Sequence, residues 1–128
     1  MRNAASSSSN GFNPRLALLC HCGLLAQRIG QRERAEAIFA GLRPLLAEPA
    51  ALDIARSLTH LLLREFDDAE ALLNELLADA PQNEAALAAL ALVMRESGRH
   101  GWRPLLLRVL ASGRDEAATQ VAQTALAS

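Results

Sequence analysis

The chain has 128 residues with a net charge of −1, and 51% of its residues are apolar although only 3% are aromatic. This length suffices for one domain with a modest core, and a composition rich in Ala and Leu but poor in aromatic residues favours helices over strands. The near-neutral charge provides no basic field for nucleic acid, and no apolar run reaches the ~18 residues that a membrane span requires.

The first 13 residues, MRNAASSSSNGFN, are polar, rich in Ser and poor in charge. We therefore expect a disordered tail over residues 1–13 and a helical domain over residues 14–128. A secretory leader is not favoured, because the apolar segment from Leu16 to Ala26 is interrupted by His21 and Gly23. A cytoplasmic protein whose two cysteines are reduced thiols is expected instead.

Start and stop signals divide the rest of the chain into seven helical segments. Asn, Asp or Pro before an apolar-periodic segment predicts a helix start, and Gly or Pro after it predicts the end. In chain order the expected helices begin after Asn13 and end at Gly30, then cover about 32–42, 49–64, 67–80 with Asp67 as cap, 84–97 after the cap Asn83, 102–111, and the residues from Asp115 onward. No segment combines period-2 alternation with β-branched residues, so the prediction is all-α.

Similar residues recur at a spacing of 34 along the chain. Small residues recur where paired helices cross closely, and large apolar residues recur where the helices interlock; the series are Gly23, Ser57 and Ala91, then Phe39, Leu73 and Leu107, then Leu42, Leu76 and Leu110. A 34-residue helix–turn–helix period is the signature of tetratricopeptide repeats. It predicts a right-handed stack of three helix pairs followed by a C-terminal capping helix. Arg56 and Arg103 depart from the usual pattern, so the third pair is expected to be degenerate.

The stretch Cys20-His21-Cys22 raises the question of a metal or redox site. Two residues along a helix rotate the side chain by ~200°, so Cys20 and Cys22 point to opposite faces. They cannot share a metal ion, a disulfide between them would break the helix, and no CxxC or HxxxH spacing supplies further ligands. In the repeat register Cys22 is a core position beside Gly23, and Cys20 lies on the inner face. We expect no metal site and no cofactor.

Catalytic motifs are also missing from the sequence, which contains no GxSxG, P-loop, GxGxxG or HExxH pattern. The neighbouring acids Asp67 and Asp68 are explained by the dipole at a helix N-terminus. We therefore predict a binding protein rather than an enzyme, with no catalytic residues.

In tetratricopeptide stacks the first helix of each pair lines the concave face, and here the register places mostly aliphatic residues on it. The candidate partner-binding residues are Cys20, Leu24, Ile54, Leu58, Leu61, Leu62, Ala88, Leu92 and Arg95. An aliphatic groove suits the apolar face of an amphipathic helix; the alternatives are packing against a second copy or against the chain's own last helix. Because such a groove favours aggregation, the isolated chain is expected to form a homodimer or to be poorly soluble.

Three stretches carry a family resemblance: AEAIFAGLRPLL, FDDAEALLNELLADAP and ALAALALVMRESGRHGWRPLLLRVLASGRDEAA. Their A-x-x-x-F helix, D-A-x-x-L-L…P segment and VLAS-x-x-D ending, with a lone Trp102 after a Gly turn, resemble the small tetratricopeptide-like components of bacterial type III secretion systems. The resemblance covers about residues 32–120. For Trp102 itself we expect a packing role between repeats rather than a role in binding.

Two functions are implied by this resemblance. The first is a cytoplasmic chaperone that cradles the amphipathic C-terminal helix of the needle subunit, together with a small helical co-chaperone, and prevents premature polymerisation. The second is a cell-wall-associated component of plant-pathogen secretion systems. The lack of a leader favours the first. A generic scaffold or adaptor that self-associates is the competing class.

Overall fold

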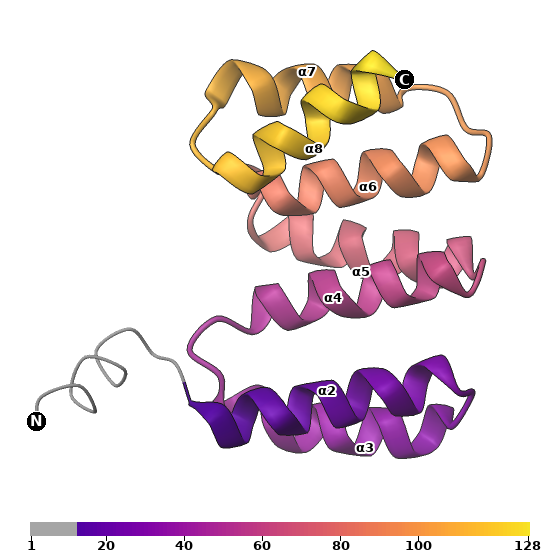
Figure 1. Ribbon diagram of the computed structural model, residues 1–128, viewed down its shortest axis with the longest axis vertical. Coiled ribbons are helices and arrows are strands. Elements are labelled where there is room, and N and C mark those ends of the chain that lie inside the picture. Colours follow the sequence, from indigo (N-terminus) through magenta and orange to yellow (C-terminus); the bar gives the residue numbers. More distant parts are fainter. Residues whose placement is uncertain (1–12) are drawn as a thin grey trace, which may run out of the picture. The chain divides into compact units, whose positions relative to one another are not determined.

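The computed structural model of the protein describes residues 13–128, and every regular element in that range is a helix (Figure 1). The helices are α2 (Pro14–Arg28), α3 (Arg32–Leu42), the short 3-10 helix η1 (Arg43–Leu45), α4 (Pro49–Leu62), α5 (Phe66–Asp79), α6 (Glu84–Glu96), α7 (Trp102–Ser112) and α8 (Glu116–Ala127). The predicted all-α, repeat-like fold is confirmed, with no strand over residues 13–128. Apart from Asn13, the predicted tail lies outside the described residues.

Two helices begin at the predicted caps, Asn13 and Asn83, and the predicted first residue of the last helix, Asp115, is its cap. Side-chain oxygens of Asn13, Asn83 and Asp115 accept hydrogen bonds of 2.9, 3.0 and 3.0 Å from first-turn amides of α2, α6 and α8. The prediction that Asp67 caps a helix is wrong, because α5 already begins at Phe66 after Glu65. Asp67 lies in the first turn instead, where its negative charge complements the helix dipole.

The 34-residue period is visible in how the first helix of each pair ends. Gly30, Arg64 and Gly98 follow α2, α4 and α6 in the left-handed region, with φ angles of 85°, 63° and 80°. In each case the next amide donates to the carbonyl five residues before it, from Gln31 to Ala26, from Glu65 to His60 and from Arg99 to Met94, at 2.9, 2.8 and 2.8 Å. This is the Schellman ending of a helix, repeated three times at the same register.

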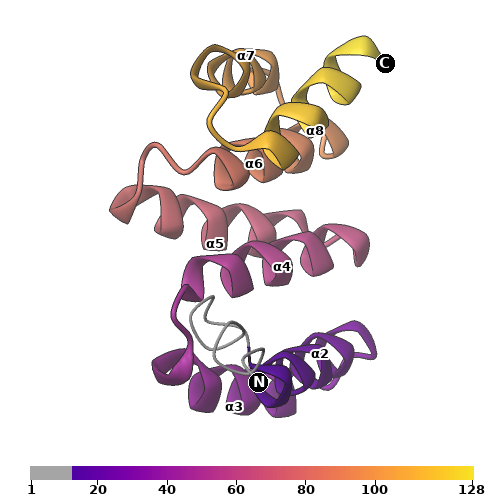
Figure 2. The same cartoon turned by 60° about the vertical axis from the view of Figure 1, so that its left-hand side comes forward.

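The described residues form two compact units, one ending at Leu52 and the other covering Asp53–Ser128. In the first unit α2 and α3 form a helical hairpin (Figure 2). The hairpin is close because Gly23 of α2 lies against Phe39 of α3; a Cβ on Gly23 would come within 2.5 Å of the ring. The core of this unit consists of Ala26, Ala35, Phe39 and Leu52.

The second unit contains most of α4 and the helices α5 to α8. Its main core joins α6, α7 and α8 and consists of Leu87, Ala88, Ala91, Leu106, Val109, Ala118, Ala122 and Ala125. The small-residue series is buried throughout this unit, because Ser57, Ala91 and Ala125 are 0%, 0% and 5% exposed, and Ala91 and Ala125 belong to this core. The predicted capping helix α8 therefore also stands in register as the first helix of a fourth pair.

Candidate functional site

An apolar hollow of about 160 Å³ lies between α4, α6 and α8 in the second unit. Its lining residues are Ile54, Leu58, Ala85, Ala88, Ala89, Leu92, Asp115, Ala117, Ala118 and Val121. The hollow exists because α6 and α8 place mainly alanines at this point, and these side chains are too short to fill the space between three helices. Four of the predicted binding residues line this hollow: Ile54 and Leu58 from α4, and Ala88 and Leu92 from α6.

A second hollow of about 540 Å³ continues along α6 and α8. It is lined by Leu92, Arg95, Ala117, Gln120, Val121, Thr124, Ala125 and Ser128. The two hollows share Leu92, Ala117 and Val121, so they form one continuous depression, which we call the α6–α8 groove. Its first part is apolar, and its second part ends in polar side chains around Arg95.

Arg95 lines the second hollow, whereas the other four predicted binding residues lie outside the groove. Cys20 and Leu24 belong to the first unit, where they are half-buried against its core. On α4, Leu61 is half-buried and Leu62 is 71% exposed, and neither lines the hollow. Ala88 is only 4% exposed within the core that includes α8. Packing against the chain's own last helix, one of the alternatives stated above, thus describes Ala88.

The contribution of α8 to the groove was missed in the sequence analysis. Ala117 and Val121 extend its apolar lining, and Gln120 and Thr124 supply polar groups. A signal was present in the sequence: the series Gly23, Ser57, Ala91 continues at Ala125, and Leu24, Leu58, Leu92 continues at Leu126. If the 34-residue spacing is extended by one more repeat, α8 becomes the first helix of a fourth pair. First helices line the concave face, so the extended spacing predicts that α8 lines the groove.

The prediction that Cys22 is a core residue is wrong. Cys22 is exposed and Cys20 is half-buried, whereas α2 buries Gly23, Ala26 and Gln27. The small-residue position was assigned correctly, but a step of one residue turns the side chain by 100° on a helix. Cys22 therefore points to solvent while Gly23 faces α3. Both thiols are free.

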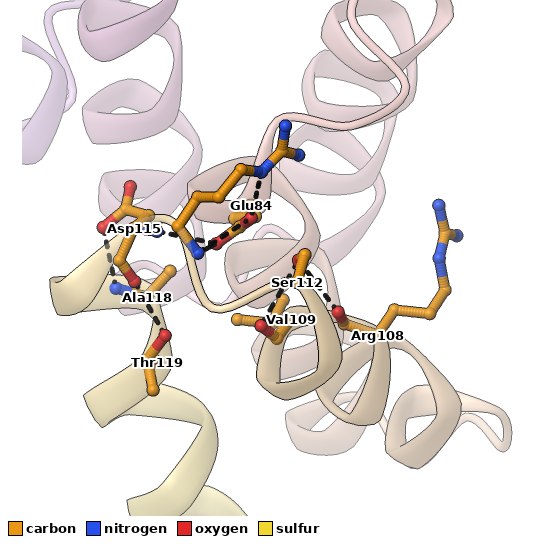
Figure 3. A network of polar contacts seen from close by, with 8 residues as sticks. Glu84, Arg108, Val109, Ser112, Asp115, Ala118 and Thr119 are labelled. Carbon is orange, nitrogen blue, oxygen red and sulfur yellow. Dashed lines mark hydrogen bonds and ion pairs between the residues drawn. The ribbon is translucent and has the colours of Figure 1, made fainter.

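A buried carboxylate fixes the start of α8 against α6 (Figure 3). Glu84, 5% exposed, accepts hydrogen bonds from the backbone amides of Asp115 at 2.8 Å and of Arg114 at 3.1 Å. The Arg114 guanidinium adds a contact of 3.0 Å through Nε. Asp115 itself caps α8, and its carbonyl accepts from the Thr119 hydroxyl at 2.9 Å.

The ionised state of Glu84 is favoured by the same contacts. The amide of Asp115 and then the Ser112 hydroxyl lower the pKa of the Glu84 carboxyl from 4.5 to about 2, with Arg114 acting in the same direction. A carboxylate this acidic is a poor general base at neutral pH. Its contacts make it a clamp that holds the α7–α8 loop and thereby one wall of the groove.

One group of potential metal ligands occurs in the part of the chain that the structure describes. Donor atoms of His60, Glu65 and Asp68 all lie within 4.8 Å of one another at the turn between α4 and α5. His60 Nδ1 lies 2.8 Å from Glu65 Oε1, closer than the roughly 3.3 Å that separates two ligands of one tetrahedral ion with bonds near 2.0 Å. This distance is that of a direct hydrogen bond, which stabilises the turn between α4 and α5.

Comparisons with protein-family models, with curated proteins and with solved structures found no match. Over residues 13–128, none of the helices combines the length and the apolar character needed to cross a membrane.

Proposed function

We propose that this chain is a non-catalytic binding protein that holds the apolar face of a partner's amphipathic helix in the α6–α8 groove. The observation that supports the proposal is the apolar hollow between α4, α6 and α8, each the first helix of a pair. Ile54, Leu58 and Leu92 are among its lining residues. A helix whose apolar residues recur at i, i+3, i+4 and i+7 offers the complementary surface. Burying that stripe supplies the binding energy.

The finer proposal concerns the identity of the partner. The resemblance over residues 32–120 supports a bacterial, cytoplasmic chaperone of type III secretion that binds the C-terminal helix of a needle subunit, alone or with a small helical co-chaperone. Sequestering the helix in this way keeps its apolar face from other copies and so prevents premature polymerisation. No cofactor is part of the proposal.

Co-expression with each short neighbouring reading frame, followed by native mass spectrometry, tests both the binding of a partner helix and the identity of the partner. A discrete complex with one small helical protein is expected, with or without a second one. Leu58→Asp and Val121→Asp should each abolish the complex, because a charge in the apolar groove cannot be solvated once the partner helix covers it. Leu107→Asp is the matched control, since Leu107 is 56% exposed on α7 and does not line the groove.

Two outcomes would contradict the proposal. If both groove variants keep the complex while circular dichroism shows unchanged helicity, the groove is not the binding surface. If the control variant loses the complex as completely as the groove variants do, α7 rather than the groove contacts the partner. A complex with a helical protein unrelated to needle subunits would retain helix binding and remove the finer proposal.

The competing function, self-association, is favoured by one observation in the first unit. Leu18, Leu25 and Ile29 of α2 are 64%, 57% and 61% exposed, and with the exposed Cys22 they follow the 4-3-4 spacing of a coiled-coil seam. A homodimer through this seam should dissociate in the variant Leu25→Gln, as measured by light scattering after size exclusion. A wild-type monomer would exclude it.

A further inference from the structure

We propose that the Arg95 end of the α6–α8 groove is a binding pocket for a carboxylate, supplied by an acidic side chain of the partner helix. This inference rests on the proposed function and specifies the chemistry of the partner. It adds a charged, directional contact to a groove whose remaining lining is mostly apolar.

The polar groups of this end are suited to a carboxylate. The Arg95 guanidinium, the Gln120 amide and the Thr124 hydroxyl are hydrogen-bond donors, and none of the described side chains that line this hollow is acidic. The Ser128 hydroxyl accepts from Arg95 and donates to the Ala125 carbonyl at 3.1 Å. Apolar side chains of Leu92, Ala117, Val121 and Ala125 form the rest of the lining. Guanidinium pairs with carboxylate through parallel N–H···O bonds, and an apolar surrounding strengthens such a pair.

The orientation of Arg95 is set by two contacts. Its Nη2 donates to Ser128 Oγ at 2.9 Å, and its guanidinium lies over the Trp102 ring, 5.4 Å from the centroid. Because stacking on Trp102 limits the rotamers of this long side chain, a partner carboxylate would meet a partly ordered donor, and the entropy lost on binding is reduced.

The surrounding charges favour an anion as well. A second guanidinium, that of Arg103, lies over Trp102 at 4.6 Å. The next residue on α6, Glu96, is paired with Arg64 at 3.7 Å. Two guanidiniums therefore lie on one indole, of which only that of Arg95 lines the groove, and the nearest acid along α6 already has a cationic partner.

Because the two hollows are continuous, the position of the partner's acidic residue relative to the partner's apolar stripe can be inferred. Leu92 belongs to both hollows, and Arg95 follows it by three residues on α6, a rise of about 4.5 Å. A partner helix seated on the apolar hollow reaches Arg95 one turn beyond its last apolar residue. The expected partner therefore carries Glu or Asp at i+3 or i+4 from one end of its stripe.

Synthetic peptides test this without knowledge of the natural partner. Four 18-residue peptides share one Leu/Ile stripe at i, i+3, i+4 and i+7 and are acetylated at the N-terminus. Three are amidated and carry Glu one turn before the stripe, Glu one turn after it, or Gln at both places; the fourth is the Gln peptide with a free terminal carboxylate. Affinities for the full chain are measured by fluorescence anisotropy at low and high salt.

One of the Glu peptides should bind at least about tenfold more tightly than the Gln peptide, as expected for a hydrogen-bonded charge pair. Arg95→Gln should abolish this preference, so that the Glu and Gln peptides bind the variant with equal affinity. Arg103→Gln is the matched control and should keep the preference, because Arg103 also stacks on Trp102 but does not line the groove. Higher salt should reduce the preference.

The possible failures are distinguishable. Equal affinities for the Glu and Gln peptides overturn the carboxylate pocket and leave helix binding intact. A preference shown only by the free-carboxylate peptide overturns the assignment to a side chain. If no peptide binds, and the natural complex also tolerates Leu58→Asp, both the inference and the proposed function fall.

Discussion

At the first turn of α6, the carboxylate of Glu84 accepts two backbone amides from the loop that precedes α8. Glu84→Gln removes the negative charge and replaces one acceptor oxygen by an amide group that cannot accept. Because both backbone amides donate to Glu84 Oε1, a Gln oxygen at that place keeps them, and Arg114 Nε loses its acceptor, Glu84 Oε2. We expect the melting temperature at pH 7 to fall by about 5 °C, measured by circular dichroism.

The same substitution should change the pH dependence. Because folding lowers the pKa of Glu84 from 4.5 to about 2, its stabilising contribution is fully present above pH 4.5 and is lost as the pH falls through about 2. The wild type should therefore lose more stability between pH 5 and pH 2 than Glu84→Gln does. Parallel stability curves for the two proteins over this range would contradict the clamp.

Gly23 offers a test of close helix packing in the first unit. A Cβ at this position would lie 2.5 Å from Cε1 of Phe39 and 3.1 Å from Cγ2 of Ile38. Gly23→Ala should therefore destabilise the unit by about 1–3 kcal/mol despite the higher helix propensity of Ala. The control Gly41→Ala meets no atom within 4 Å and should be neutral or stabilising by up to about 1 kcal/mol. Urea titrations compare the two; equal effects would refute the contact.

These residues also show how far sequence alone reaches. Gly23 was found because a close crossing demands a small residue and the demand recurs every 34 residues. Cys22 was misplaced because an error of one residue in helical register changes the face. Glu84 was not found, since its partners Arg114 and Asp115 lie 30 and 31 residues away and no local pattern links them.

At the level of elements, the three Schellman endings differ in one respect. The left-handed position is a glycine in the first and third pairs (Gly30 and Gly98) but an arginine, Arg64, in the second pair. A non-glycine residue in the left-handed region costs about 1 kcal/mol, and the exposed pair of Arg64 with Glu96 is worth little. Arg64→Gly should thus stabilise the protein by about 0.5–1 kcal/mol in urea unfolding. Gly98→Ala at the equivalent position should destabilise it; a stabilising effect there would contradict the argument.

Most helix ends were predictable because their signals are local. A side-chain cap such as Asn83 acts within three residues, and a Gly stop such as Gly30 acts on its own φ angle. The role of α8 was predicted only in part. Its capping position follows from its place in the chain, whereas its contribution to the groove depends on packing against α6, more than 20 residues earlier.

For the whole molecule, the 34-residue period predicted the repeat-like all-α fold, because recurring small and large residues impose the same helix pairing each time. The groove was predicted less completely. Ile54, Leu58, Ala88 and Leu92 line one hollow, but Cys20 and Leu24 pack against the core of the first unit. Which apolar positions stay open depends on side-chain volumes across three helices, and periodicity does not encode these volumes.

The division into two compact units predicts that each unit can unfold locally without the other. In repeat proteins stability is a sum of local terms and nearest-neighbour contacts, so a perturbation in one unit should propagate weakly. Gly23→Ala should accelerate amide hydrogen exchange in α2 and α3 while leaving α6, α7 and α8 close to wild type. Glu84→Gln should do the reverse.

Hydrogen exchange monitored by mass spectrometry resolves the two units through separate peptides. The helix α4 is the informative segment, because it contributes Leu52 to the first core and begins the second unit at Asp53. If α4 couples the units, both variants should raise its exchange by a smaller factor than they raise that of their own unit. Uniform acceleration along the whole chain by either variant would mean that the protein unfolds as a single cooperative body, and the two-unit description would then be wrong for its energetics.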